Sequence, residues 1–193
     1  MKKTLLIIAI ALLGVSNYSM AQLSLGIKGG VNLSTASIDL GGSAGSTIDG
    51  RTGYHFGIYS VIKLGPIGIQ PEAFYSVQGA DVTASGVTNA VEAGYLQVPV
   101  LVRLNFLKVL NVHAGPQFGF LLSEAIDDPN GVVEGVNTTN TSIAAGVGLD
   151  LPFGLMATVR YVKGLNDILE GVDVDSSKGD MVQISVGFTL LGK

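Results

Sequence analysis

The chain has 193 residues, of which 47% are hydrophobic and only 13% are charged, and it contains 27 glycines and no cysteine. Without cysteine, disulfides, thiolate metal sites and a cysteine-linked lipid anchor are excluded. Once Lys2 and Lys3 are set aside, nine basic residues stand against 15 acidic ones, so nothing in the charge balance favours nucleic acid as a partner.

The N-terminal segment has the parts of a secretory signal peptide. Lys2 and Lys3 precede an apolar run, Leu5–Val15, which is about half the length that spans a bilayer. Ser19–Ala21 then fits the rule of small residues at a cleavage site. We therefore expect residues 1–21 to be a signal peptide and residues 22–193 to form the exported domain. The alternative is an N-terminal membrane anchor.

Beyond this segment, apolar residues alternate with small or polar ones, which is typical of strands with two different faces. The alternation is complete in Leu23–Ser34, where every second residue is apolar or glycine. The other segments that show it are Tyr54–Leu64, Ile67–Val77, Gly94–Leu104, Lys108–Leu122, Ser142–Leu151, Leu155–Gly164 and Val182–Leu190. Pro71, Pro99 and Pro116 fall inside these strands, and we expect β-bulges to accommodate them because proline cannot donate a hydrogen bond to a sheet.

The connections between these eight strands alternate in length. The short ones are Gly65–Pro66, Asn105–Leu107 and Pro152–Gly154. The long ones are Thr35–Arg51, Gly79–Ala93, Ser123–Asn140 and Leu165–Gly179, and they carry 12 of the 15 acidic residues. Gly65 suits the first position of a type II′ turn that pairs Leu64 with Ile67. We expect the long connections to be loops on the cell surface, because membrane barrels have short periplasmic turns and longer extracellular loops.

The residue types on the two strand faces indicate where the barrel resides. A soluble lipocalin-like barrel alternates in the same way, but its solvated exterior would be rich in Lys and Glu. Here the polar face is mostly Gly, Ser, Asn and Gln, and the other face is almost purely apolar. We therefore predict an all-β fold, an eight-stranded antiparallel up-and-down transmembrane β-barrel in the outer membrane.

The polar strand faces place five charged residues in the interior, a polar network formed by Lys28, Glu72, Arg103, Asp150 and Arg160. Glu72 and Arg160 each lie about five residues above a short turn, on strands that are four places apart in a ring of eight. We expect these two to meet across the lumen, joined by Lys28, and Arg103 to pair with Asp150 near the short turns. The alternative is that water and the side chains of Gln70, Gln97 and Gln117 solvate each charge separately.

No pattern indicates catalysis or a cofactor. His55 and His113 both fall on polar strand faces, where a hydrogen-bonded interior histidine is the ordinary role, and no Ser/His/Asp spacing accompanies them. Asp173 and Asp175 have the spacing of the first ligands of a calcium loop, but the glycine and glutamate of such a loop are misplaced. We expect no enzymatic activity, no cofactor and no metal site; divalent ions that bridge the acidic loops to lipid phosphates are the alternative.

Several stretches together resemble a known family. They are GIKGGVNLS at Gly26–Ser34, IQPEAFYSVQGA at Ile69–Ala80, YLQVPVLVRL at Tyr95–Leu104, AGPQFGFLL at Ala114–Leu122, GVGLDL at Gly146–Leu151 and RYVKGLNDI at Arg160–Ile168. In this order they resemble the PorT-like outer-membrane β-barrel proteins of Gram-negative bacteria, which are similar in architecture to the small OmpX and OmpA barrels. The chain departs from such barrels at its end, where Phe188 is followed by Thr189–Lys193 instead of closing the chain.

The resemblance implies an outer-membrane barrel and carries over no functional residue. Its namesake is implicated in the export of secreted proteases, so an accessory role in a secretion system is one expectation. A structural, adhesive or surface-interaction role is the other, and a pore is least favoured because eight strands leave room only for side chains. The expected partners are outer-membrane lipid and other envelope or secretion proteins. The sequence does not indicate an oligomeric state.

Overall fold

The computed structural model describes residues 22–34, 37–39, 47–84, 87–106, 109–126, 138–165 and 180–192. The expected signal peptide and the acidic pair Asp173 and Asp175 lie outside the described residues, as does most of the connection Leu165–Gly179. Among the described residues, no helix is both long and apolar enough to cross a membrane.

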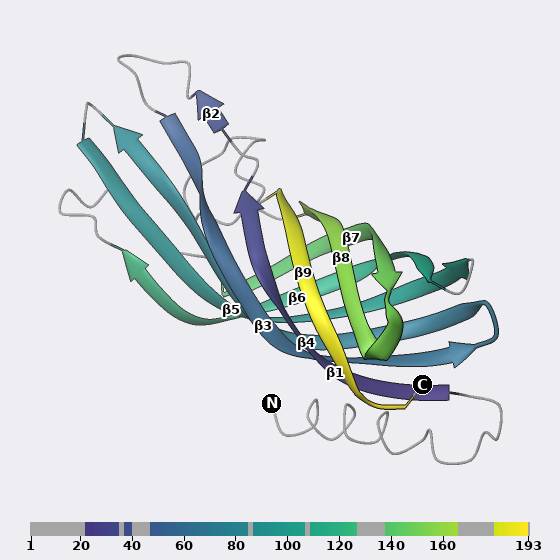
Figure 1. Cartoon of the computed structure of the whole chain (residues 1–193). Helices are drawn as coiled ribbons and strands as arrows, with labels where there is room; N and C mark the ends of the chain where they lie inside the picture. Colours follow the sequence, from purple (N-terminus) through teal and green to yellow (C-terminus); the bar gives the residue numbers. More distant parts are fainter. Residues whose placement is uncertain are drawn as a thin grey trace.

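The described chain is almost entirely β-strand (Figure 1). The strands are β1 Gln22–Ser34, β2 Ser37–Asp39, β3 Thr47–Leu64, β4 Ile67–Ala84, β5 Val87–Phe106, β6 Leu110–Ile126, β7 Thr139–Asp150, β8 Leu155–Gly164 and β9 Met181–Leu191, with a 3₁₀ turn, η1, at Pro152–Gly154. Antiparallel pairing runs in the order β1-β9-β8-β7-β6-β5-β4-β3, and β1 also pairs with β3. This closes the predicted eight-stranded up-and-down barrel, to which β2 adds three residues on β3.

The side chains of the barrel wall are apolar outside and polar inside, as the alternation predicted. Large hydrophobic residues such as Val102 and Ile58 are more than half exposed on the outer face. Outward aromatic residues form two bands, which is the arrangement of aromatic girdles at the two membrane interfaces. Phe106 and Phe188 lie near the short turns, and Tyr54, Phe56, Tyr75, Phe118, Phe120 and Tyr161 lie towards the other end.

Two of the short turns have left-handed backbone conformations at their tips. Gly65 has a φ of 70°, and Leu64 pairs with Ile67 as predicted. The turn between β7 and β8 places Phe153 at φ 65° and ψ 15°, followed by Gly154 at φ 86°. Phe153 thus occupies the position that Asn usually takes in a two-residue hairpin turn.

The expectation that bulges would accommodate the prolines is wrong. The register shifts of the barrel lie at Leu25/Gly26, Arg51/His55 and Gly94/Tyr95, away from every proline. At each proline the ladder instead skips two residue pairs on one side and resumes in the same register. The physical reason is that the N–H of a residue serves only one neighbouring strand. Pairing on the other side therefore continues, as for Pro71 with Val100.

The wall of the barrel is much taller on one side than on the other, which also differs from the expectation. Strands β3 to β6 have 17 to 20 residues, whereas β1 and β7 to β9 have 10 to 13. Figure 1 shows the ends of β3, β4 and β5 reaching far beyond those of β8 and β9. Much of the predicted loops Thr35–Arg51 and Gly79–Ala93, and the ends of Ser123–Asn140, are therefore strand.

The tall side forms what we call the protruding sheet, residues 47–51, 79–84, 87–93 and 123–126. Arg51, Gly79 and Glu92 lie in one row on its outer face, and Arg51 and Glu92 form an exposed ion pair with an N–O distance of 3.7 Å. The outer face of the membrane band carries exposed apolar side chains, so this row of charged, exposed side chains lies outside the membrane band.

Candidate functional site

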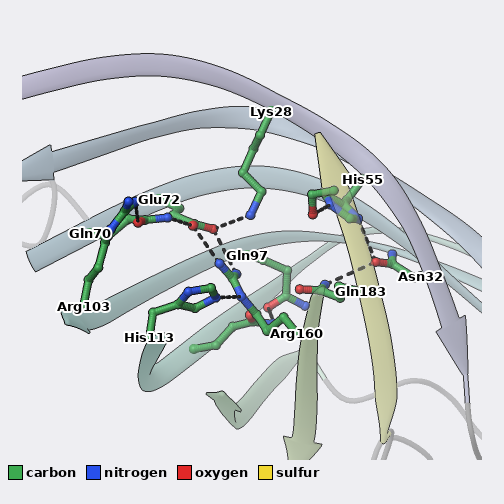
Figure 2. Close-up of polar contacts among 12 residues, drawn as sticks. Lys28, Asn32, His55, Gln70, Glu72, Gln97, Arg103, His113, Arg160 and Gln183 are labelled. Carbon is green, nitrogen blue, oxygen red and sulfur yellow. Dashed lines mark hydrogen bonds and ion pairs between the residues drawn. The ribbon is translucent and has the colours of Figure 1, made fainter. Parts of the chain in front are cut away.

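Three of the five charged residues that the sequence placed in the interior, Lys28, Glu72 and Arg160, meet at the centre of the lumen (Figure 2). The Arg160 guanidinium donates to both oxygens of Glu72, at 3.0 Å to Oε2 and 2.8 Å to Oε1. The Lys28 ammonium lies 2.8 Å from Oε2 of the same carboxylate. All three side chains are at most 1% exposed. Glu72 and Arg160 come from opposite strands, so the cluster closes the barrel across its width.

A chain of hydrogen bonds leads from this cluster to the mouth at the short turns. Gln70 donates to Glu72 Oε1 at 2.7 Å and accepts from Arg103 Nη1 at 2.9 Å. Arg103 also donates from Nε to Asn105 at 2.7 Å and from Nη2 to Asp150. The second pair that the sequence predicted, Arg103 with Asp150, is thus present. The Arg103 side chain is 1% exposed and the Asp150 side chain is 28% exposed.

The charges of this hydrogen-bonded network do not cancel fully. Its described members are three cations, Lys28, Arg103 and Arg160, and two carboxylates, Glu72 and Asp150. The surplus positive charge lies at Glu72, whose carboxylate binds both Lys28 and Arg160. The Lys28 ammonium also lies 5.0 Å from the centre of the Phe74 ring. Such a contact with the face of an aromatic ring stabilises a desolvated cation. Phe74 is an apolar residue on the otherwise polar lumen face of β4, and this contact gives it a role there.

Both histidines are interior residues with hydrogen-bond partners. His113 Nε2 accepts from Arg160 Nε at 3.4 Å, so its Nδ1 donates to Asn111 at 3.0 Å. His55 contacts Asn32 and Ser185, each at 2.8 Å. Among the described residues, no group of three or more His, Cys, Asp or Glu could hold a metal ion.

Apolar side chains share the interior with this network, which the strand patterns only partly indicated. Leu101, Ala144, Val162 and Met181 form one buried cluster. Tyr59, Val61 and Met156 form a second. Phe74 and Tyr95, each at most 1% exposed, also lie inside. Together with the central ion cluster they fill the lumen at the height of the membrane band.

A pocket of about 340 Å³ lies at the short-turn mouth, below the filled part of the lumen. Its walls come from β1, β3, β5, β7, β8 and β9. Polar groups in it include Lys63, Arg103 and Asp150, and apolar ones include Tyr59, Met156 and Phe153. No single strand pattern in the sequence could indicate it, because each strand contributes only a few residues.

A comparison with family models agrees with the closed barrel and its apolar exterior. Residues 17–170 match the model of the outer membrane protein β-barrel domain. The chain belongs to this family. The match supports the predicted outer-membrane location, and it names the broad family and not the PorT-like group that the sequence resembles.

Among solved structures, the crystal structure of the outer membrane protein OprG from Pseudomonas aeruginosa is similar, with a TM-score of 0.56. The match covers 89% of this chain and 97% of OprG, at 12% sequence identity. At this identity the likeness shows a common fold. No curated protein sequence matches the chain.

Proposed function

We propose that this protein is a plugged outer-membrane barrel that anchors a surface-interaction site on its protruding sheet, without enzymatic activity. The observation that carries the proposal is the continuation of β3 to β6 beyond the membrane band, where Arg51 and Glu92 form an exposed ion pair on the outer face. A wall that served only to cross the membrane would end at the interface. Here four strands continue past it and present a charged row to water.

The edge of the protruding sheet gives the kind of partner that it fits. The pairing of β6 with β7 ends at Phe120–Thr139, and one further backbone hydrogen bond joins Leu121 to Thr138 at 2.9 Å. Beyond it, Leu122–Ile126 has no strand partner on that side within the described part of the chain. An unpaired strand edge offers a row of backbone donors and acceptors to an extended polypeptide. We therefore expect the partner to be a polypeptide that adds a strand.

A filled lumen argues against the alternative of a diffusion pore. Lys28, Glu72 and Arg160 are at most 4% exposed and come from β1, β4 and β8, so they meet from three sides of the barrel. Their mutual hydrogen bonds hold them there. A solute that crossed the lumen would have to displace this buried ion cluster.

The proposal can be tested by site-specific photo-crosslinking on intact cells. A crosslinking residue in place of Leu122, which is 61% exposed at the sheet edge, should form a defined protein adduct. The same residue in place of Val186, which is 67% exposed on the lipid face, should not. A lysine at position 126 should reduce the adduct, because charge on an edge opposes strand addition.

The outcomes separate the candidate roles. Equal adducts at the two positions would reflect crowding in the membrane and overturn the proposal, as would no adduct at position 122. A crosslinking residue in place of Phe153, at the short-turn mouth, tests the alternative. If a secretion component formed an adduct there and position 122 formed none, the accessory role in secretion would replace the surface-interaction role.

A further inference from the structure

We propose that the pocket at the short-turn mouth binds an N-acyl amino acid with a free carboxylate and an apolar side chain. The C-terminal residue of a polypeptide and a free N-acyl amino acid share this chemistry. The inference does not rest on the surface-interaction role, because it concerns the opposite mouth of the barrel, which faces the periplasm in barrels of this kind.

The pocket provides a cation for the carboxylate. Lys63 is half-buried on the lumen side of β3 and lines the pocket. It has no ion-pair partner within the described part of the chain. Arg103 is the other cation there, but its Nε, Nη1 and Nη2 each already donate to an acceptor. Lys63 is therefore the group that an incoming anion would meet.

The pocket also provides an acceptor for an amide N–H. Asp150 binds Arg103 through Oδ2, while its other oxygen accepts no hydrogen bond from any described residue. Its carboxylate is 28% exposed. Arg103 thus orients the carboxylate and leaves one oxygen available to accept from an amide N–H of a ligand in the pocket.

The remaining wall suits an apolar side chain. Tyr59, Val61 and Met156 form a buried cluster beside the charged groups. The Tyr59 hydroxyl is 2.8 Å from Thr189 Oγ1, so this hydrogen bond fixes the ring. A volume of about 340 Å³ lies at the lower end of the range for small-molecule sites, and it would hold one or two amino-acid residues.

The rim carries a strained aromatic residue. Phe153 lines the pocket and is 91% exposed, with a left-handed backbone conformation at φ 65°. A bulky residue in this region costs free energy, and such strain gathers at ligand clamps and other functional positions. The ring projects from the turn, where it could cover a ligand once the pocket is filled.

These features together select one ligand class. A simple amine would leave Lys63 without an anion, and a fatty acid would leave the free oxygen of Asp150 without a donor. A C-terminal leucine-like residue supplies the anion, the N–H and the apolar group at once.

The test uses the full-length mature barrel in lipid nanodiscs and three probes, with binding followed by NMR chemical shifts and calorimetry. N-acetyl-leucine has all three groups, N-acetyl-leucinamide lacks the anion, and 4-methylpentanoate lacks the N–H. We expect N-acetyl-leucine to bind tightest, with each other probe weaker by about tenfold or more, the size expected when a hydrogen bond to a charged group is lost. A peptide ending in free leucine should bind at least as well as N-acetyl-leucine if the natural ligand is a polypeptide, and less well if it is a free acyl amino acid.

Two variants and one control locate the binding. Lys63→Met should abolish the preference for the acid over the amide, and Phe153→Asn should weaken all probes while the barrel stays folded. Lys163→Met removes a lysine that lies exposed near the other end of β8 and should change nothing. The proposal is overturned if N-acetyl-leucine does not bind, if the three probes bind equally, or if Lys63→Met behaves like Lys163→Met.

Discussion

Glu72 and Arg160 lie on opposite strands and meet across the lumen through two hydrogen bonds of 2.8 and 3.0 Å. Because both are buried, Glu72→Ala would leave two cations without a carboxylate. We expect it to lower the free energy of unfolding by about 3–5 kcal/mol, the range for a broken buried ion pair. Urea unfolding of the refolded barrel measures this, and Glu72→Ala combined with Arg160→Met should recover part of the loss.

The matched control for this experiment is Glu92→Ala. Glu92 also pairs with an arginine, Arg51, but its side chain is 55% exposed. An exposed pair of this kind contributes little, so the variant should stay within about 0.5 kcal/mol of wild type. If Glu72→Ala changed stability as little as Glu92→Ala, the central cluster would not hold the barrel together.

The position of the membrane boundary can be tested by cysteine labelling, since the natural chain has no cysteine. A cysteine at Glu92, on the outer face of the protruding sheet, should react with a membrane-impermeant maleimide added to whole cells. A cysteine at Val102, which is 55% exposed on the membrane-facing surface, should not react. A cysteine at Phe153 should react only after the outer membrane is disrupted. Labelling of position 153 on intact cells, with position 92 protected, would reverse the topology.

The turn at Phe153 predicts an unusual stabilising substitution. The left-handed region costs a residue other than glycine roughly 1–2 kcal/mol, and Asn tolerates it better than Phe. Phe153→Asn should therefore raise the free energy of unfolding by about 1 kcal/mol. Phe153→Ala keeps the Cβ atom and the strain, so it should bring no such gain, and a gain equal to that of Asn would point to the loss of the exposed ring as the cause.

The filled lumen predicts that the isolated barrel does not conduct ions in a planar bilayer. Replacing Lys28, Glu72 and Arg160 together by serine removes the central cluster without leaving an unpaired charge. If this cluster closes the lumen, the triple variant should show conductance steps that the wild type lacks. Steady conductance of the wild-type barrel would contradict the closed lumen.

The sequence alone could predict the barrel and its central ion pair for a simple reason. The alternation fixes which residues share a face, and counting from the short turns fixes their height, so Glu72 and Arg160 could be placed level. Other partners depend on side-chain conformations that alternation does not determine. Gln70, for example, bridges Glu72 and Arg103, whereas the sequence indicated only that it lies inside.

The protruding sheet was missed for two reasons. The register shift at Arg51/His55 interrupts the alternation where β3 leaves the membrane band, and polar residues and glycines are frequent in residues 47–51 and 79–93, a composition typical of loops. An apolar alternation does continue through Ala80, Val82 and Ala84. It was not interpreted as a strand because the sequence argument assumed that the strands end at the membrane surface. The mouth pocket was missed because its lining converges from six strands.

The unequal lengths of the described strands make the barrel asymmetric about its axis. The four long strands β3 to β6 are neighbours in the wall, so the row that holds Arg51 and Glu92 faces one direction in the plane of the membrane. A neighbouring protein that contacts this row has to lie on that side of the barrel. The rotation of the barrel about its own axis therefore decides which of its neighbours can reach the row.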